Sequence, residues 1–263
     1  MGNDSLSWEK IKQHTSARIG LGRAGGSLPT KEMLKLRWDH AGARDAVWET
    51  CNWKEIIEGL QEQDWPGIIE VNSCAATRQD YLLRPDQGRR LSEDSVGKLK
   101  SHSLQKKNYD LSICIIDGLS PLAIRKNIIP FLNLLGPELK VLFKKIAPIV
   151  CVTNGRVAVG DEVAEVFGAK MLIVFIGERP GLTSADSLGI YMTYEPTIGS
   201  TDERRNCISN VRKEGLSYEK ASEKLSYLLK EGLDQKRSGV LLKDRMTDAI
   251  EGFTGSSEKQ LPK

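Results

Sequence analysis

The sequence predicts an α/β fold with a mostly parallel sheet, and two observations lead to that prediction. From Tyr109 onward, apolar runs of strand length alternate with helical stretches, which is the order expected of βαβ units. The run Met171–Ile176 is apolar at every position, as in a strand that helices cover on both faces. We therefore expect one sheet sandwiched between helices.

Residues 1–62 have a helical pattern and predict a small helical N-terminal domain or arm. The expected helices are one from Trp8 with Ser7 as its cap, one that Thr30 caps, and one over residues 53–61. The side chains of Leu34, Trp38 and Ala41 share one face of the second helix. Amphipathic helices that are this few in number gain most by packing on something else.

Residues 63–263 are expected to form the α/β domain. Its expected strands cover residues 68–71, 81–83, 111–116, 149–152, 171–176 and 190–194. Its expected helices are 92–102 with Ser92 as cap, a helix from Ser120-Pro121 that bends or breaks at Pro130 and ends near Gly136, 161–167 closed by Gly168, and 216–233 with Ser217 as cap and Gly232 as its end. The segment 199–207 is expected to be a polar loop.

Composition excludes several classes of function. The 38 basic and 35 acidic residues give a formal charge of +3, too balanced for a nucleic-acid-binding protein. No apolar stretch approaches the roughly 18–20 residues that span a bilayer, and the N-terminus lacks the apolar core of a secretory signal. The cysteines form no CxxC pair and the histidines are widely spaced. We therefore expect a cytoplasmic protein with reduced cysteines and no metal site.

Three loops at the carboxyl ends of expected parallel strands are the strongest candidate site. They are Asp117–Leu119, Gly155–Val157 and Gly177–Arg179. Ligands of open α/β sheets bind at this edge, so the loops should converge. A glutamate such as Glu178 accepts hydrogen bonds from amide groups, which suits a large ligand with many amides. From the residues alone, a local ion pair between Glu178 and Arg179 in a structural turn is an equally good explanation.

Two other motifs are weaker candidates. The segment Gly20–Gly26 (GLGRAGG) contains GxGxxG, but no strand precedes it, so the context of a dinucleotide-binding loop is missing. Cys207 lies in the expected polar and basic loop, which would lower the pKa of its thiol, but no histidine is near it in the sequence. A buried cysteine, or one that acts through its backbone, is favoured over a nucleophile.

Nine segments of the sequence resemble one known family. They are TSARIGLGRAG, DHAGARDAV, LLRPDQGRRL, IIDGLSPLAI, GRVAVGDEV, IGERPGL, DSLG, RNCISNVR and SGVLLKD, in this order. Together they span about Thr15 to Asp244 and resemble the small (light) chain of adenosylcobalamin-dependent ethanolamine ammonia-lyase. The segments IGERPGL and RNCISN are long and unusual, which makes the resemblance specific.

The resemblance implies a Rossmann-like fold with a helical N-terminal part. It also implies a lyase that converts ethanolamine to acetaldehyde and ammonia, in which the large (heavy) subunit holds the substrate. This chain would bind adenosylcobalamin through Val157, Glu178 and Cys207 and would contribute no catalytic residue. The partners would be the large subunit and a higher-order hetero-oligomer, with no nucleic acid and no membrane. The location would be the cytoplasm, with residence in a bacterial microcompartment left open.

The sequence lacks the DxHxxG pattern with which some cobalamin proteins replace the cofactor's own base, because Asp39-His40 is followed by Ala41-Gly42. A base-on cofactor that retains its nucleotide arm is therefore the consistent hypothesis. Two alternatives remain: a stand-alone Rossmann-like nucleotide-binding enzyme, with GLGRAGG as its phosphate loop, and a purely structural assembly subunit. The basic segments Arg18–Arg23 and RPDQGRR are further candidates for an interface between chains.

Overall fold

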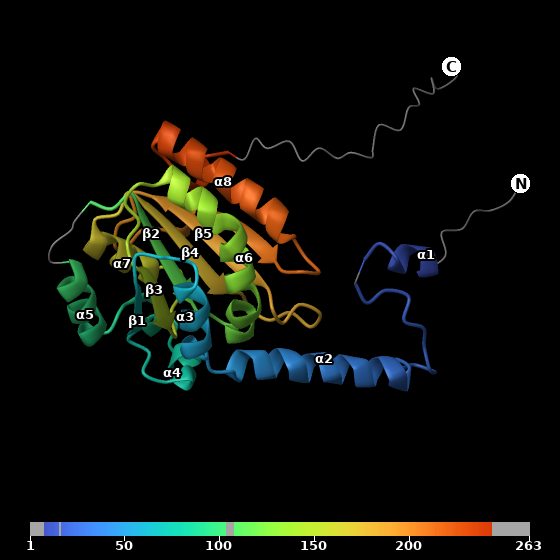
Figure 1. The fold of residues 1–263 in the computed structure, drawn as a ribbon. Helices are drawn as coiled ribbons and strands as arrows, with labels where there is room; N and C mark the ends of the chain where they lie inside the picture. Colours follow the sequence, from blue (N-terminus) through green and yellow to red (C-terminus); the bar gives the residue numbers. More distant parts are fainter. Residues whose placement is uncertain (1–7, 16, 104–107, 244–263) are drawn as a thin grey trace, which may run out of the picture.

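The core of the protein is one mixed six-stranded sheet in the order β1-β3-β2-β4-β5-β6 (Figure 1). The computed structural model describes residues 8–15, 17–103 and 108–243. The strands are β1 (Ile68–Asn72), β2 (Leu111–Ile116), β3 (Ile149–Thr153), β4 (Met171–Gly177), β5 (Leu188–Tyr194) and β6 (Arg205–Val211). The first four in sheet order pair in parallel, whereas β5 and β6 are antiparallel to their neighbours. The prediction of a mostly parallel α/β sheet is confirmed.

The helices cover both faces of this sheet. They are α1 (Trp8–Lys12), α2 (Thr30–Trp48), α3 (Trp53–Gln61), α4 (Arg78–Leu83), α5 (Glu93–Ser103), α6 (Pro121–Leu142), α7 (Val159–Phe167) and α8 (Tyr218–Gln235), with short 3-10 turns η1 (Gln87–Arg89), η2 (Asp202–Arg204) and η3 (Gly239–Leu241). One core lies between the sheet and α3, α6 and α8, and a second lies between the sheet and α5 and α7. The fold therefore has three layers.

The central strands are apolar at nearly every position because their side chains pack alternately into the two cores. Ile113 and Phe175 enter the core beneath α6, whereas Cys114 and Val174 enter the core beneath α7. Successive side chains of a strand point to opposite faces, so a strand between two layers has no solvent side. This is why the run Met171–Ile176 identified its strand correctly.

Helix α2 projects away from the sheet and carries α1 at its far end (Figure 1). Of its residues, only Ala46 is buried. Thr30 is the first residue of α2 and not its cap, which is Pro29. The expected cap Ser7 lies outside the described residues.

Several predicted helix ends are confirmed by their capping bonds. Ser120 and Ser217 accept a backbone N–H from Ala123 and Lys220, and Ser92 does so from Ser95. Gly168 closes α7 with a φ of 61°. At the end of α8 the prediction is wrong, because the helix passes Gly232 and stops before Lys236, which takes the left-handed conformation.

Three other predictions are wrong. Residues 81–83 belong to helix α4, because Thr77 and Asp80 form a reciprocal cap that starts a helix at Arg78. Residues 205–211 form strand β6 and not a loop. Helix α6 runs through Pro130 to Leu142. A proline removes one helical hydrogen bond, but the buried side chains Phe131, Leu132, Leu135 and Leu139 beyond it stabilise the continued helix by more than that loss.

Candidate ligand-binding site

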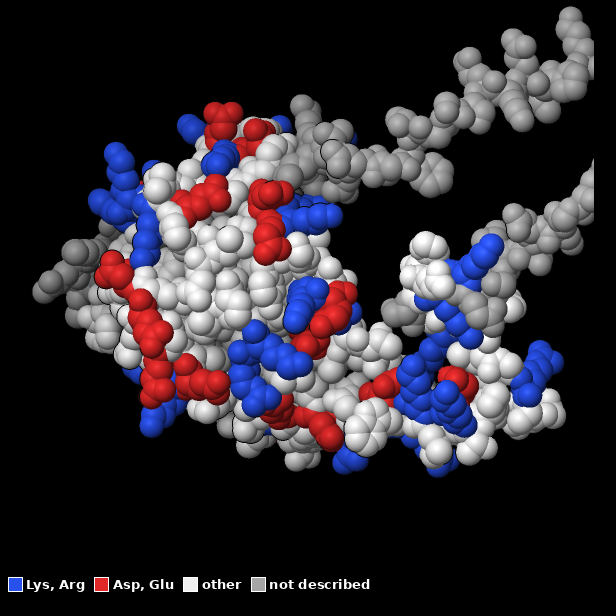
Figure 2. Space-filling view, turned by 45° about the vertical axis from the view of Figure 1, so that its right-hand side comes forward, with Lys and Arg blue, Asp and Glu red and all other residues white. Residues whose placement is uncertain are grey.

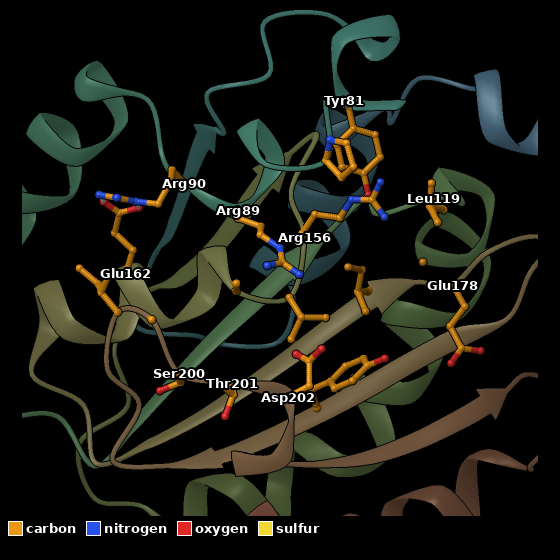
Figure 3. A pocket seen from close by; sticks show the side chains of 18 of the residues that line it. Tyr81, Arg89, Arg90, Leu119, Arg156, Glu162, Glu178, Ser200, Thr201 and Asp202 are labelled. Carbon is orange, nitrogen blue, oxygen red and sulfur yellow. Dashed lines mark hydrogen bonds and ion pairs between the residues drawn. The ribbon is translucent and has the colours of Figure 1, made fainter. Parts of the chain in front are cut away.

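The three predicted loops meet in one pocket at the carboxyl ends of β2, β3 and β4 (Figure 3). The pocket encloses about 960 Å³. Leu119, Val157 and Glu178 line it, one from each loop. The opposite wall comes from the segment around Tyr81 and Arg89 and from the loop Ile198–Asp202. The prediction that these loops converge is confirmed.

Two glycines allow the loops after β2 and β4 to touch. Gly118 has a φ of 58°, and a Cβ there would lie 2.2 Å from the carbonyl oxygen of Gly177. A Cβ on Gly177 would lie 2.1 Å from the carbonyl oxygen of Ser120. The N–H of Leu119 donates to the Gly177 carbonyl across this contact, at 2.9 Å. A side chain at either glycine would push the two loops apart.

Val157 is held at the pocket by the residue before it. The backbone N–H of Arg156 donates to the Gly88 carbonyl at 2.7 Å, which fixes the loop after β3 against turn η1. Val157 is half-buried, packs against the α7 core and lines the pocket. Its apolar side chain therefore presents a fixed hydrophobic surface to a ligand.

Glu178 lines the pocket and ties three segments together. Its carboxylate accepts hydrogen bonds from the hydroxyls of Ser187 and Ser209 and from the N–H of Asn210, the last at 3.1 Å. Among the described residues, no ion pair joins Glu178 to Arg179, so the local salt bridge is not the explanation of the motif. A carboxylate offers about four lone-pair positions. One acceptor position therefore remains for a ligand.

Cys207 lies on β6 opposite Tyr191 of β5. It is solvent-exposed but does not line the pocket, whereas Tyr191 does. Partial desolvation by the sheet raises the pKa of the Cys207 thiol, and this effect outweighs the hydrogen bond with Tyr191 that lowers it. The weaker alternative, a basic loop that lowers this pKa, is wrong because the residue is on a strand, and the favoured alternative of a buried cysteine is wrong because the residue is exposed. Of the three predicted contacts, the structure brings Val157 and Glu178 together in the pocket and puts Cys207 beside Tyr191 on the neighbouring strand.

The sequence did not reveal the wall around Tyr81. Tyr81 is fully buried, and its ring packs against the guanidinium groups of Arg78 and Arg156, whose central carbons lie 4.9 and 4.5 Å from the ring centre. A Cβ on Gly88 would lie 3.0 Å from this ring. The sequence signal was available in Thr77 and Asp80, whose reciprocal cap predicts a helix that turns Tyr81 inward.

The other sequence candidates lie elsewhere. Gly20 belongs to a loop that follows helix α1, where it accepts a hydrogen bond from the Lys12 ammonium at 3.0 Å. A dinucleotide-binding loop requires a strand before it, so the structure contradicts that use of GLGRAGG. Within the described ranges, no group of three or more potential ligands is placed to hold a metal ion. No described helix is both long and apolar enough to cross a membrane.

Comparison with known proteins identifies the family. The family model described as ethanolamine ammonia-lyase light chain (EutC) matches residues 5–243. The chain belongs to this family. The ethanolamine ammonia-lyase small subunit of Pseudomonas aeruginosa (strain UCBPP-PA14) is 47% identical over 247 residues, which are 93% of this chain and 90% of that protein. The small subunit of Pseudomonas putida (strain GB-1) is 44% identical over 254 residues, 96% of this chain and 93% of that protein.

Membership confirms the resemblance that the sequence motifs indicated. The ethanolamine ammonia-lyase light-chain family consists of components of a lyase complex, so this chain is one part of an enzyme.

Proposed function

We propose that this chain is the small subunit of an adenosylcobalamin-dependent ethanolamine ammonia-lyase, in which it binds the cofactor while the large subunit holds ethanolamine. The observation that carries the proposal is that two family-implied contacts, Val157 and Glu178, line one pocket of about 960 Å³. That volume is at the upper end of the range for small-molecule sites, about 300–1,000 Å³. It is therefore suited to a large cofactor.

The chemistry of the pocket fits adenosylcobalamin. The cofactor carries many amide groups, and the remaining acceptor position of Glu178 takes an amide N–H. Within the part of the chain that the structure describes, the buried hydroxyl of Tyr81 and the buried Nε of Arg156 have no hydrogen-bond partner. Unpartnered buried polar atoms of this kind indicate that a ligand or water completes the site.

The cofactor, when bound, supplies the cobalt–carbon bond whose homolysis starts the radical reaction. Everything this chain contributes is binding and orientation. Val157 offers apolar contact, Glu178 accepts a hydrogen bond, and Cys207 supports Tyr191 from the neighbouring strand. We assign the chain no catalytic residue.

The partner surface that we propose for the large subunit is the projecting helix α2. Leu34, Trp38 and Trp48 share one face of α2 and are 58%, 80% and 51% exposed. Lys and Arg side chains gather on the arm next to uncharged surface, at the right of Figure 2. A subunit of a larger complex buries such residues against its partner. We retain the division into an N-terminal arm, residues 1–62, and a Rossmann-like domain, residues 63–263, as part of this proposal.

We propose a cytoplasmic location for the complex, and the family resemblance extends this to a bacterial microcompartment. The structure supports a reducing environment, since the cysteines at positions 51, 74, 114, 151 and 207 are all free thiols.

The test is co-expression with a large subunit of the same family, followed by titration with adenosylcobalamin and an acetaldehyde assay with ethanolamine. We expect activity only when both chains are present. A chain that folds but neither joins the large subunit nor retains cobalamin would refute the proposal.

Replacing Glu178 tests the assignment at residue level. Glu178→Ala removes a charged acceptor, worth about 1.5–3 kcal/mol, so the dissociation constant for adenosylcobalamin should rise about ten- to a hundredfold in the assembled enzyme. Ser209→Ala is the matched control, because it removes one donor to the carboxylate and leaves the acceptor in place. Equal loss of affinity in both variants would show that Glu178 acts only by tying the loop after β4 to β6.

A further inference from the structure

The charges that line the pocket are unequally neutralised. Arg90 pairs with Glu162 at 3.2 Å, and the carboxylate of Glu178 is engaged by two hydroxyls and an N–H. Arg89 and Arg156 also line the pocket, and within the described residues neither guanidinium has a carboxylate partner. One end of the pocket therefore carries two unneutralised positive charges.

Both arginines reach into that end of the pocket: the Arg156 guanidinium lies over the Tyr81 ring, and the Arg89 guanidinium points toward the side of the pocket where Asp202 lies (Figure 3). Arg89 belongs to turn η1 and Arg156 to the loop after β3. The hydrogen bond from the Arg156 N–H to the Gly88 carbonyl fixes the two segments together. The backbone therefore fixes the two segments that carry these arginines next to each other.

Tyr81 provides a second, independent observation at the same place. Its side chain is fully buried and lines the pocket, and its hydroxyl has no hydrogen-bond partner among the described residues. Burial raises the pKa of Tyr81, so the hydroxyl stays protonated at neutral pH and can donate. The Nε of Arg156 is a further buried donor without a partner. Such groups are rarely left unsatisfied in native proteins.

The three side chains define the chemistry of what they bind. Two guanidinium groups and a protonated phenol are all donors, so the bound group is an acceptor with negative charge. A planar carboxylate is satisfied by the fork of one arginine. Donors from three segments that surround one end of a pocket suit the tetrahedral oxygens of a phosphate, which accept from several directions.

We propose that Arg89, Arg156 and Tyr81 form a phosphate subsite at one end of the pocket. The inference rests on the proposed function, because the phosphate it assigns is the phosphodiester in the nucleotide arm of a base-on cobalamin. The subsite fixes which way the cofactor lies: the nucleotide arm points toward η1 and the amide-bearing side toward Glu178.

The test compares two ligands on the assembled complex of small and large chains. Adenosylcobalamin carries the phosphodiester, whereas adenosylcobinamide lacks it together with the nucleotide. Dissociation constants are measured by equilibrium dialysis for the wild type, for Arg89→Met and for Tyr81→Phe. Arg179→Met is the matched control, since Arg179 lines the pocket beside Glu178. Tyr81→Phe keeps the buried ring and removes only the unpartnered hydroxyl.

We expect Arg89→Met to weaken adenosylcobalamin binding about ten- to a hundredfold and Tyr81→Phe about three- to tenfold, with adenosylcobinamide binding unchanged in both. Arg179→Met should not discriminate between the two ligands. Equal losses for both ligands, or no loss for adenosylcobalamin, would overturn the subsite.

A second probe separates this inference from the proposed function. If the wild-type complex binds neither corrinoid, the proposed function fails, and phosphorus NMR with adenosine 5′-monophosphate decides the subsite. Line broadening that Arg89→Met abolishes would support a phosphate site for a nucleotide ligand. No broadening in the wild type would overturn the subsite as well.

Discussion

Asp117 is a carboxyl group that the fold buries at the end of β2, where it is 2% exposed. Its nearest charged group, the Nη1 of Arg78, lies 3.8 Å from one oxygen, and the N–H of Gly155 lies 3.4 Å from the other. These contacts are long, so desolvation dominates and raises the pKa of Asp117 to about 6. The loop that the carboxyl supports is the one that touches Gly177 beside the pocket.

This raised pKa predicts a pH-dependent stability. An unfolded aspartate ionises near pH 4, whereas folded Asp117 holds its proton until about pH 6. The folded state therefore binds the extra proton between these values, and stability falls as the pH rises through this window, by up to about 3 kcal/mol. Urea unfolding of the wild type and of Asp117→Asn at pH 4.5 and 7.5 measures this change in the free energy of unfolding. The variant should gain stability relative to the wild type at the higher pH; a difference that does not change with pH would contradict the prediction.

At the residue scale, the sequence predicted the parts of the site that depend on strand ends. Val157 and Glu178 follow apolar runs whose carboxyl ends share one edge of the sheet, and the pocket contains both. Tyr81 and Arg89 were not predicted as site residues because their position depends on how a short helix and turn pack over the sheet. Periodicity does not encode such packing. Cys207 was misplaced for a related reason, since β6 has a mixed polar and apolar sequence.

At the scale of elements, helix α7 is joined to strand β6 by a buried ion pair. The guanidinium of Arg205 donates to both carboxylate oxygens of Asp161, at 2.7 and 2.6 Å, and both side chains are 1% exposed. Arg205 also donates to the Ser200 carbonyl at 3.0 Å, in the loop that forms one wall of the pocket. This pair holds the antiparallel edge of the sheet to the parallel part.

Breaking this pair should destabilise the protein strongly. Arg205→Met and Asp161→Asn each leave a buried polar or charged partner uncompensated, so each should lower the free energy of unfolding by about 3–5 kcal/mol. The double variant Asp161→Asn/Arg205→Met should lose less than the sum of the two. Urea denaturation measures these differences. The exposed pair Arg84–Asp86 is the control, and Asp86→Asn should leave stability unchanged. Additive losses in the double variant would show that the two residues act independently.

Elements were predictable from sequence in proportion to their burial. The strands β2 and β4 are buried at every position, and their boundaries were found almost to the residue. Strand β6 alternates irregularly because one side faces solvent, and it was taken for a loop. The extension of α6 past Pro130 depends on a tertiary core that local rules for proline do not include.

At the scale of the whole molecule, the arm formed by α1 and α2 buries far fewer side chains than the rest of the protein does. The sheet is covered on both faces, whereas α2 leaves Trp38 80% exposed. Trp38→Asp should therefore leave the unfolding transition unchanged and weaken assembly with the large subunit by about thirtyfold or more. Analytical ultracentrifugation of the mixed subunits measures the assembly.

Val141 provides the matched control, since it is apolar and 86% exposed but lies on α6, away from the arm. Val141→Asp should leave assembly intact. If Trp38→Asp assembles as the wild type does, α2 is not the docking surface and the partner binds elsewhere on the chain.

Arg78 joins this arm to the pocket through a single side chain. Its Nε donates to the Val47 carbonyl in the last turn of α2, at 2.8 Å, and its Nη1 donates to the Gly118 carbonyl in the loop after β2, at 2.7 Å. A displacement of α2 would therefore change a hydrogen bond to the loop after β2, which borders the pocket. Thermodynamic reciprocity then applies: by whatever factor docking on α2 raises affinity for the ligand, occupancy of the pocket raises affinity for the docking partner by the same factor.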